Sequence, residues 1–142
     1  MLPSLERLRR AGVFQRAYNR RMVVSTSVVT LYVLPKEGKK TDGKGKSSWR
    51  PLAGFVVAKK VSKSSCKRNR AKRRIREAYR LLRTDVFDGR RDDIALQDWY
   101  ALVFVANDAA LTASYQEIED SVVNVLVRAS SKNRKDKRDP PR

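Results

Sequence analysis

The stretch from Lys59 to Arg83 contains the residues of this chain that are best suited to binding chemistry. Twelve of them are Lys or Arg, and Glu77 is the only acid. A guanidinium group binds two phosphate oxygens at once, and an ammonium group attracts phosphate as a point charge. An ordinary solvent-exposed helix mixes Glu with Lys, so this excess of positive charge predicts a polyanionic partner.

These residues are spaced as they would be on a helix that packs on a core. At about 100° per residue, five positions form one apolar stripe: Ala71, Ile75, Ala78, Tyr79 and Leu82. A polar band runs along one side of the stripe, with Arg68 at its border: Lys72, Arg76, Asn69, Arg80 and Arg73. A tail that binds by charge alone needs no apolar stripe. We therefore expect a folded helix from about Ser65 to Arg83 that holds one basic edge outward.

Groups that could catalyse a reaction are scarce. The chain contains no histidine, so Ser25, Ser27 and the Ser64–Ser65 pair have no imidazole base to activate them. Cys66 is the only cysteine, and it lies among basic residues that could lower the pKa of its thiol. A lone small residue near a helix start is more often structural, so we expect no catalytic side chain.

Five aspartates surround a polar segment, Thr84 to Gln97, that we expect to be a loop: Asp85, Asp88, Asp92, Asp93 and Asp98. Their oxygens could recruit a divalent cation, which a stand-alone nuclease would need. The simpler interpretation is a solvated acidic loop that offsets Arg90 and Arg91. We favour it, and we expect the protein alone to bind no metal.

Aromatic residues provide a second kind of binding chemistry. Phe14 and Tyr18 are four residues apart, which places them together on one turn of helix, and Tyr32 lies in a β-branched run. Unpaired bases stack on such rings, and each stack is worth about 1–3 kcal/mol. Phe55 and Phe104 lie in apolar runs, where we expect core side chains instead.

The overall composition limits the kind of partner. The chain has 142 residues, a net charge of +18 and a pI near 10.7, which suits one basic domain that attracts phosphate polyanions. A membrane surface is the weaker alternative, because the apolar stripe is too modest for an interfacial helix and no apolar run approaches about 18 residues. The N-terminal residues lack the apolar core of a signal peptide, and we expect a cytoplasmic protein.

The elements that must position these residues can be read from apolar spacing. We expect helices at Ser4–Arg10, around Phe14 and from Ser114, where Glu117 completes a capping box. Apolar runs predict strands at Val23–Leu34 (long enough for two), Leu52–Ala58 and Trp99–Ala106. The order α-β-β-β-α-β-α predicts an α/β (α+β) two-layer sandwich with a central sheet. Residues 1–129 would form one domain with a flexible basic loop at 35–51, and residues 130–142 a disordered basic tail.

The basic helix resembles the signature helix of the bacterial ribonuclease P protein component. The similarity lies in the pattern R-N-x-x-K-R-x-x-R-E over Arg68–Glu77, and in the preceding segment Gly54–Val61, which is similar to the strand leading into that helix. Phe14, Tyr18 and the segment Thr30–Tyr32 also match family positions. The resemblance spans most of the chain, from Leu5 to Val127.

The resemblance implies both a fold and a function. The fold would be a sandwich with a left-handed βαβ crossover, an exception to the usual hand. The protein would be a non-catalytic subunit that assists a catalytic RNA in removing the 5′ leader from precursor tRNA. Mg²⁺ would be held mainly by the RNA, and the partners would be the catalytic RNA and precursor tRNA, with neither DNA nor membrane among them.

The resemblance also implies two sets of site residues. On the signature helix, the residues predicted to bind RNA are Arg68, Asn69, Arg70, Lys72, Arg73, Arg76 and Arg80. The residues predicted to line a cleft for the single-stranded leader are Phe14, Tyr18, Tyr32, Lys59 and Lys60. The loop at 35–51 is longer than usual for the family, and Asn107 stands where the family often has a basic residue.

One other function stays open on composition alone. A ribosomal or chaperone-like RNA-binding protein with a similar sandwich fold would have the same charge and the same kind of basic helix. Stimulated removal of a tRNA leader is the property that distinguishes the two.

Overall fold

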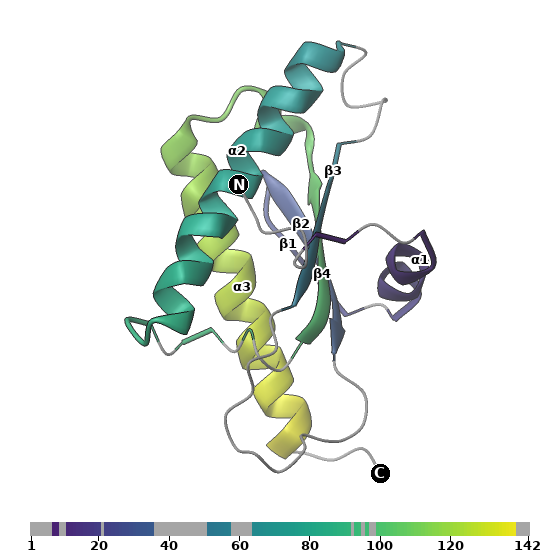
Figure 1. Ribbon diagram of the computed structural model, residues 1–142, viewed down its shortest axis with the longest axis vertical. Helices are drawn as coiled ribbons and strands as arrows, with labels where there is room; N and C mark the ends of the chain where they lie inside the picture. Colours follow the sequence, from purple (N-terminus) through teal and green to yellow (C-terminus); the bar gives the residue numbers. More distant parts are fainter. Residues whose placement is uncertain are drawn as a thin grey trace.

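A computed structural model of the chain places a four-stranded sheet between helices (Figure 1). It describes residues 7–8, 11–20, 22–35, 51–57, 64–91, 93–94, 96 and 99–138. The helices are α1 (Ala11–Arg20), α2 (Ser65–Phe87), α3 (Tyr115–Arg138) and the short 3₁₀ helix η3 (Asp108–Leu111). The strands are β1 (Val23–Ser25), β2 (Val29–Pro35), β3 (Leu52–Val56) and β4 (Trp99–Ala106). The predicted order α-β-β-β-α-β-α is confirmed, with α1 as its first helix.

The strands lie side by side in the order β1-β2-β4-β3. β2 runs antiparallel to both β1 and β4, and β3 runs parallel to β4. A parallel pair needs a crossover, and α2 provides it between β3 and β4. The hand of this crossover stays a prediction.

Alternation along the strands gives the sheet two apolar faces. In β2, Leu31 and Val33 join the larger core with α2 and α3, whereas Tyr32 and Leu34 face α1. Figure 1 shows this arrangement, with α2 and α3 on one side of the sheet and α1 on the other. The α/β sandwich is therefore confirmed, and α1 adds a smaller layer on the second face.

The apolar stripe predicted for the basic helix is the buried face of α2: Ala71, Ile75, Ala78, Tyr79 and Leu82. Ser64 caps the helix by accepting a hydrogen bond from the Lys67 N–H. The helix continues past Arg83 to Phe87, so the first four residues of the predicted loop are helical. Val86 and Phe87 pack against the core, and this packing extends the helix until Gly89, at a φ of 82°, turns the chain away.

The predicted helix at Ser4–Arg10 is wrong at the two residues of it that the structure describes. Arg7 pairs with Ala53 in a parallel bridge, and the Leu8 N–H donates to the Ala53 carbonyl at 2.9 Å. The exposed edge of β3 leaves backbone groups to be satisfied, and this segment satisfies one of them. Leu8 is buried, and the helix that follows, α1, begins at Ala11 and includes Gly12.

The tail predicted to be disordered from residue 130 is helical as far as Arg138. Ser130 is fully buried, so the core holds the helix at the point where the tail was expected to begin. Residues 131–138 contain neither Gly nor Pro, and a helix that has already formed extends at little cost. Residues 139–142 and residues 36–50 of the predicted loop lie outside the described residues.

The capping box at the start of α3 is confirmed. The Ser114 N–H donates to Glu117 Oε1 at 2.9 Å, and the Glu117 N–H donates to Ser114 Oγ at 3.1 Å.

We expect Ser114→Ala to lower the free energy of unfolding by about 1 kcal/mol, because one N-terminal N–H loses its acceptor. Urea denaturation measures this loss. A change below about 0.3 kcal/mol would show that water replaces the cap fully.

Candidate nucleic-acid interface

One edge of α2 presents five of the seven predicted RNA-binding residues beside the buried stripe, whereas Arg70 lies on the opposite flank of the helix, in a hollow beside η3. Asn69 and Arg73 are exposed, and Lys72 and Arg76 are half-buried. The Arg76 guanidinium carbon lies 5.9 Å from the centroid of the Phe55 ring, which itself stacks on Phe104. The core therefore holds the guanidinium group of Arg76 in place, while Asn69 and Arg73 beside it are exposed to solvent. We refer to Arg68, Asn69, Lys72, Arg73 and Arg76 as the α2 edge.

Arg68 occupies the border of the apolar stripe, as its position on the helix predicts. Its Nε atom is buried and has no hydrogen-bond partner among the described residues. A buried donor on a charged group is costly to leave unpaired. Arg68 as a whole is half-buried, so the rest of its side chain stays partly accessible beside the apolar stripe.

Arg80 differs from the α2 edge because it already has an anionic partner. Its Nε donates to Glu77 Oε1 at 3.2 Å, and its second nitrogen contacts the other carboxylate oxygen. This hydrogen bond, with the charge of Arg80, lowers the pKa of Glu77 and raises that of Arg80. Both side chains are partly exposed to solvent, so the contribution of the pair to stability is small. Glu77 instead reduces the charge that Arg80 offers to a ligand.

We expect Glu77→Gln to strengthen RNA binding about threefold, because Arg80 is released and the one acid of the basic stretch is lost. The direction in which pH changes the charge that Arg80 offers to RNA follows from the lowered pKa of Glu77. The carboxylate holds Arg80 at neutral pH and releases it only as the pH falls through that lowered pKa. Filter binding of wild type and variant at pH 7 measures the gain. Weaker binding by the variant would mean that Glu77 orients Arg80 for the ligand.

The aromatic residues predicted for a leader cleft meet on the other face of the sheet. Tyr18 and Tyr32 form an edge-to-face pair with ring centroids 4.8 Å apart, and Phe14 packs in the same cluster. All three are half-buried, so each ring keeps an exposed part. Burial, together with the neighbouring Tyr32, raises the pKa of Tyr18, which therefore stays a neutral phenol. We call Phe14, Tyr18 and Tyr32 the α1 cluster.

Gly54 of β3 allows the Phe14 ring to approach the backbone of the sheet closely. A Cβ placed on Gly54 would lie 2.7 Å from two ring atoms of Phe14 and 3.2 Å from the Leu8 side chain. The ring of Phe14 therefore rests directly on the backbone of β3. Lys59 and Lys60, the other residues predicted for this cleft, lie outside the described residues.

Two residues near the α1 cluster, Tyr100 and Arg16, were not predicted from the sequence. Tyr100 packs against the same buried apolar residues as the α1 cluster, and the Arg16 guanidinium carbon lies 5.9 Å from the centroid of the Tyr100 ring. The sequence shows Tyr100 only as part of an apolar strand, beside Trp99 on the other face. An isolated arginine on α1 gives no signal of its own. Their pairing depends on how α1 crosses β4.

The acidic loop is arranged as a set of ion pairs. Arg90 contacts Asp85 at 2.9 Å and Asp88 at 3.4 Å, and Arg91 contacts Asp93 at 2.9 Å. These contacts confirm the interpretation that the carboxylates offset neighbouring arginines. Asp92 and Asp98 lie outside the described residues. Within the described ranges, His, Cys, Asp and Glu do not gather in any group of three that could hold a metal ion.

Asn107 has a structural role at the end of β4. Its amide nitrogen donates to the Thr26 carbonyl at 2.9 Å and to Thr30 Oγ1 at 3.1 Å. These bonds tie β4 to the β1–β2 hairpin. The Asn107 side chain, which stands in place of the family's basic residue, thus forms its hydrogen bonds within the protein.

Cys66 is exposed as a free thiol at the start of α2.

A model of the family described as Ribonuclease P matches residues 2–130 of this chain. The ribonuclease P protein component of Clostridium novyi is 36% identical over 128 residues, which cover 90% of this chain and 96% of that protein. The component from Alkaliphilus oremlandii is 31% identical over 125 residues, 88% of this chain and 91% of that protein.

None of the helices in the described part of the chain is long and apolar enough to cross a membrane.

Two solved structures share the fold. The RNase P protein of Staphylococcus aureus gives a TM-score of 0.63 at 22% identity, over 87% of this chain and 94% of that one. The RNase P protein of Thermotoga maritima gives a TM-score of 0.63 at 17% identity, over 87% and 96% of the two chains. At these identities the likeness carries the arrangement of helices and strands alone.

Proposed function

The chain belongs to the ribonuclease P protein component family, and we propose that it holds the catalytic RNA with the α2 edge and the 5′ leader of precursor tRNA with the α1 cluster. The family fixes the wider role. The protein works with an RNA subunit in a ribonucleoprotein that removes the 5′ leader from precursor tRNA. A ribosomal or chaperone-like function is not favoured.

The α2 edge is the observation that carries the first half of the proposal. Its guanidinium and ammonium groups project from a helix whose other face is fixed in the core. Phosphates on folded RNA lie at fixed spacings, and a rigid helix offers cations at rises of about 6 Å per four residues. Such an edge loses little conformational freedom on binding, unlike a flexible basic tail.

The α1 cluster supports the second half. Its three aromatic side chains are packed together but keep exposed ring surface, as stacking on unpaired bases requires. Because the cluster lies on the opposite face of the sheet from α2, the two RNA segments would contact different surfaces. One protein can then hold the catalytic RNA and the substrate leader at the same time.

We propose that the protein supplies binding and the RNA supplies the chemistry. The chain has no histidine, and the serines named above have no imidazole to activate them. The described aspartates of the acidic loop do not fit a Mg²⁺ site, because Asp85, Asp88 and Asp93 face arginine side chains. We assign the Mg²⁺ to the RNA subunit and the setting to the cytoplasm, where an exposed thiol such as that of Cys66 stays reduced.

Reconstitution with the catalytic RNA of a related bacterium tests the proposal. At low Mg²⁺, the wild-type protein should increase the rate of leader removal at least tenfold, since it would offset RNA–RNA repulsion and hold the leader. Protein alone should cleave nothing. An unrelated RNA-binding protein of similar charge is the control, and equal stimulation by that control would overturn the proposal in favour of a general RNA chaperone.

A further inference from the structure

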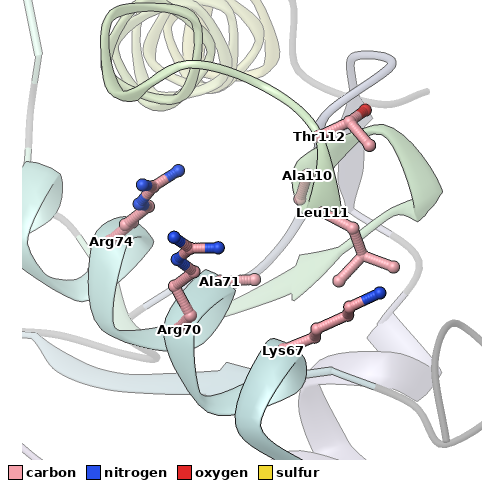
Figure 2. Close-up of a pocket in the computed structure, with 7 residues that line it drawn as sticks. All are labelled: Lys67, Arg70, Ala71, Arg74, Ala110, Leu111 and Thr112. Atoms are coloured by element: carbon pink, nitrogen blue, oxygen red, sulfur yellow. The ribbon is translucent and has the colours of Figure 1, made fainter. Parts of the chain in front are cut away.

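A hollow of about 320 Å³ lies between the first half of α2 and the 3₁₀ helix η3 (Figure 2). Three of its lining residues are cationic and come from α2: Lys67, Arg70 and Arg74. The others are Ala71 of α2 and, across the hollow, Ala110, Leu111 and Thr112. No carboxylate belongs to this described lining.

The hollow lies on the opposite flank of α2 from the α2 edge. At 100° per residue, Arg74 and Lys67 fall on one side of the buried stripe, while Lys72 and Arg76 fall on the other. η3 packs against α2 on this second flank. A single phosphate group held by Lys72 and Arg76 therefore does not reach the hollow.

Arg74 is fixed in a position that suits an anion. Its side chain is half-buried, and one terminal nitrogen donates to the Ala113 carbonyl at 3.3 Å. The remaining N–H donors of the guanidinium stay available. Figure 2 shows the charged ends of Arg70, Arg74 and Lys67 extending from α2 toward the side occupied by η3. Thr112 lies on the opposite side of the hollow from these three side chains.

We propose that this hollow binds a phosphate group of the RNA backbone, as a second contact on the far flank of α2. Two guanidinium groups and one ammonium group match the charge and the several acceptor oxygens of a phosphodiester. The apolar part of the lining, Ala110 and Leu111, restricts the room beside the phosphate. This inference rests on the proposed function, since the RNA that reaches the hollow is the one that α2 binds.

The salt dependence of RNA binding tests the proposal. We expect Arg74→Gln to weaken binding of the catalytic RNA about tenfold at low salt, and to reduce the slope of log affinity against log salt by about 0.7–0.9, the share of one phosphate. The control is Arg128→Gln, which removes the same charge from an exposed position on α3. An unchanged slope in Arg74→Gln, with wild-type stimulation of leader removal intact, overturns this inference alone.

A second measurement uses inorganic phosphate and the protein without RNA. At constant ionic strength, phosphate should shift the Arg74 Nε–Hε NMR signal with a saturable curve, and the shift should be lost in Lys67→Gln. Linear, unsaturated shifts would mean an adventitious ion only and would contradict a built site. Because no RNA is present, this measurement stands even if the reconstitution fails.

Discussion

Replacing Lys72 and Arg73 together by glutamine will weaken binding of the catalytic RNA by about a hundredfold and leave the fold intact. A hydrogen bond to a charged group is worth about 1.5–3 kcal/mol, so each lost contact with phosphate costs roughly tenfold or more in affinity. Neither side chain forms an ion pair or hydrogen bond within the described part of the chain, and neither belongs to the buried stripe of α2. Both charges are therefore available to RNA and dispensable for folding.

A matched double variant provides the control. Arg90→Gln with Arg128→Gln removes the same net charge from exposed positions outside α2. Gel-shift affinities at one fixed salt concentration should differ by at least tenfold between the two double variants, and their thermal midpoints should agree within a few degrees. If the two variants bind RNA equally, net charge governs binding and the α2 edge has no special role.

The parts of the fold that follow local patterns were predictable from the sequence. The stripe of α2 and the bounds of β4 depend on 3.6-residue and two-residue spacing, and both are as expected. The segment at Arg7 was not predictable, because its pairing partner Ala53 is far away in the sequence. The end of α3 was missed for a similar reason, since the burial of Ser130 depends on tertiary packing.

In the candidate site, too, the features set by local spacing were predictable and those set by tertiary packing were not. The α2 edge can be read from the sequence, because every member lies on one helix. The hollow beside η3 cannot be read in this way: Arg74 and Thr112 meet only through the packing of α2 against the segment after β4. The charge of Arg80 was predicted as part of the RNA-binding set, but the sequence did not indicate how closely Glu77 engages it.

Gly54→Ala will weaken binding of the tRNA leader and leave binding of the catalytic RNA unchanged. The added Cβ would stand 2.7 Å from the Phe14 ring, so the ring and α1 must move away from β3. Overpacking of this kind costs about 1–3 kcal/mol of stability. Displacement of Phe14 should also reduce the preference for precursor over mature tRNA about tenfold, since one base stack is worth about 1–3 kcal/mol. Binding of the catalytic RNA should be unchanged, because α2 packs on the other face of the sheet.

Gly12→Ala is the matched control for Gly54→Ala, because the same methyl group there would meet nothing within 4 Å. Gly12 lies in α1, where alanine is the better helix former, so this variant should keep the preference for precursor and gain up to about 0.5 kcal/mol. The measurement is the affinity of each reconstituted holoenzyme for precursor and for mature tRNA. Equal losses on both tRNAs in Gly54→Ala would remove the α1 cluster from leader binding, because a stacking contact with the leader acts only on RNA that still carries it.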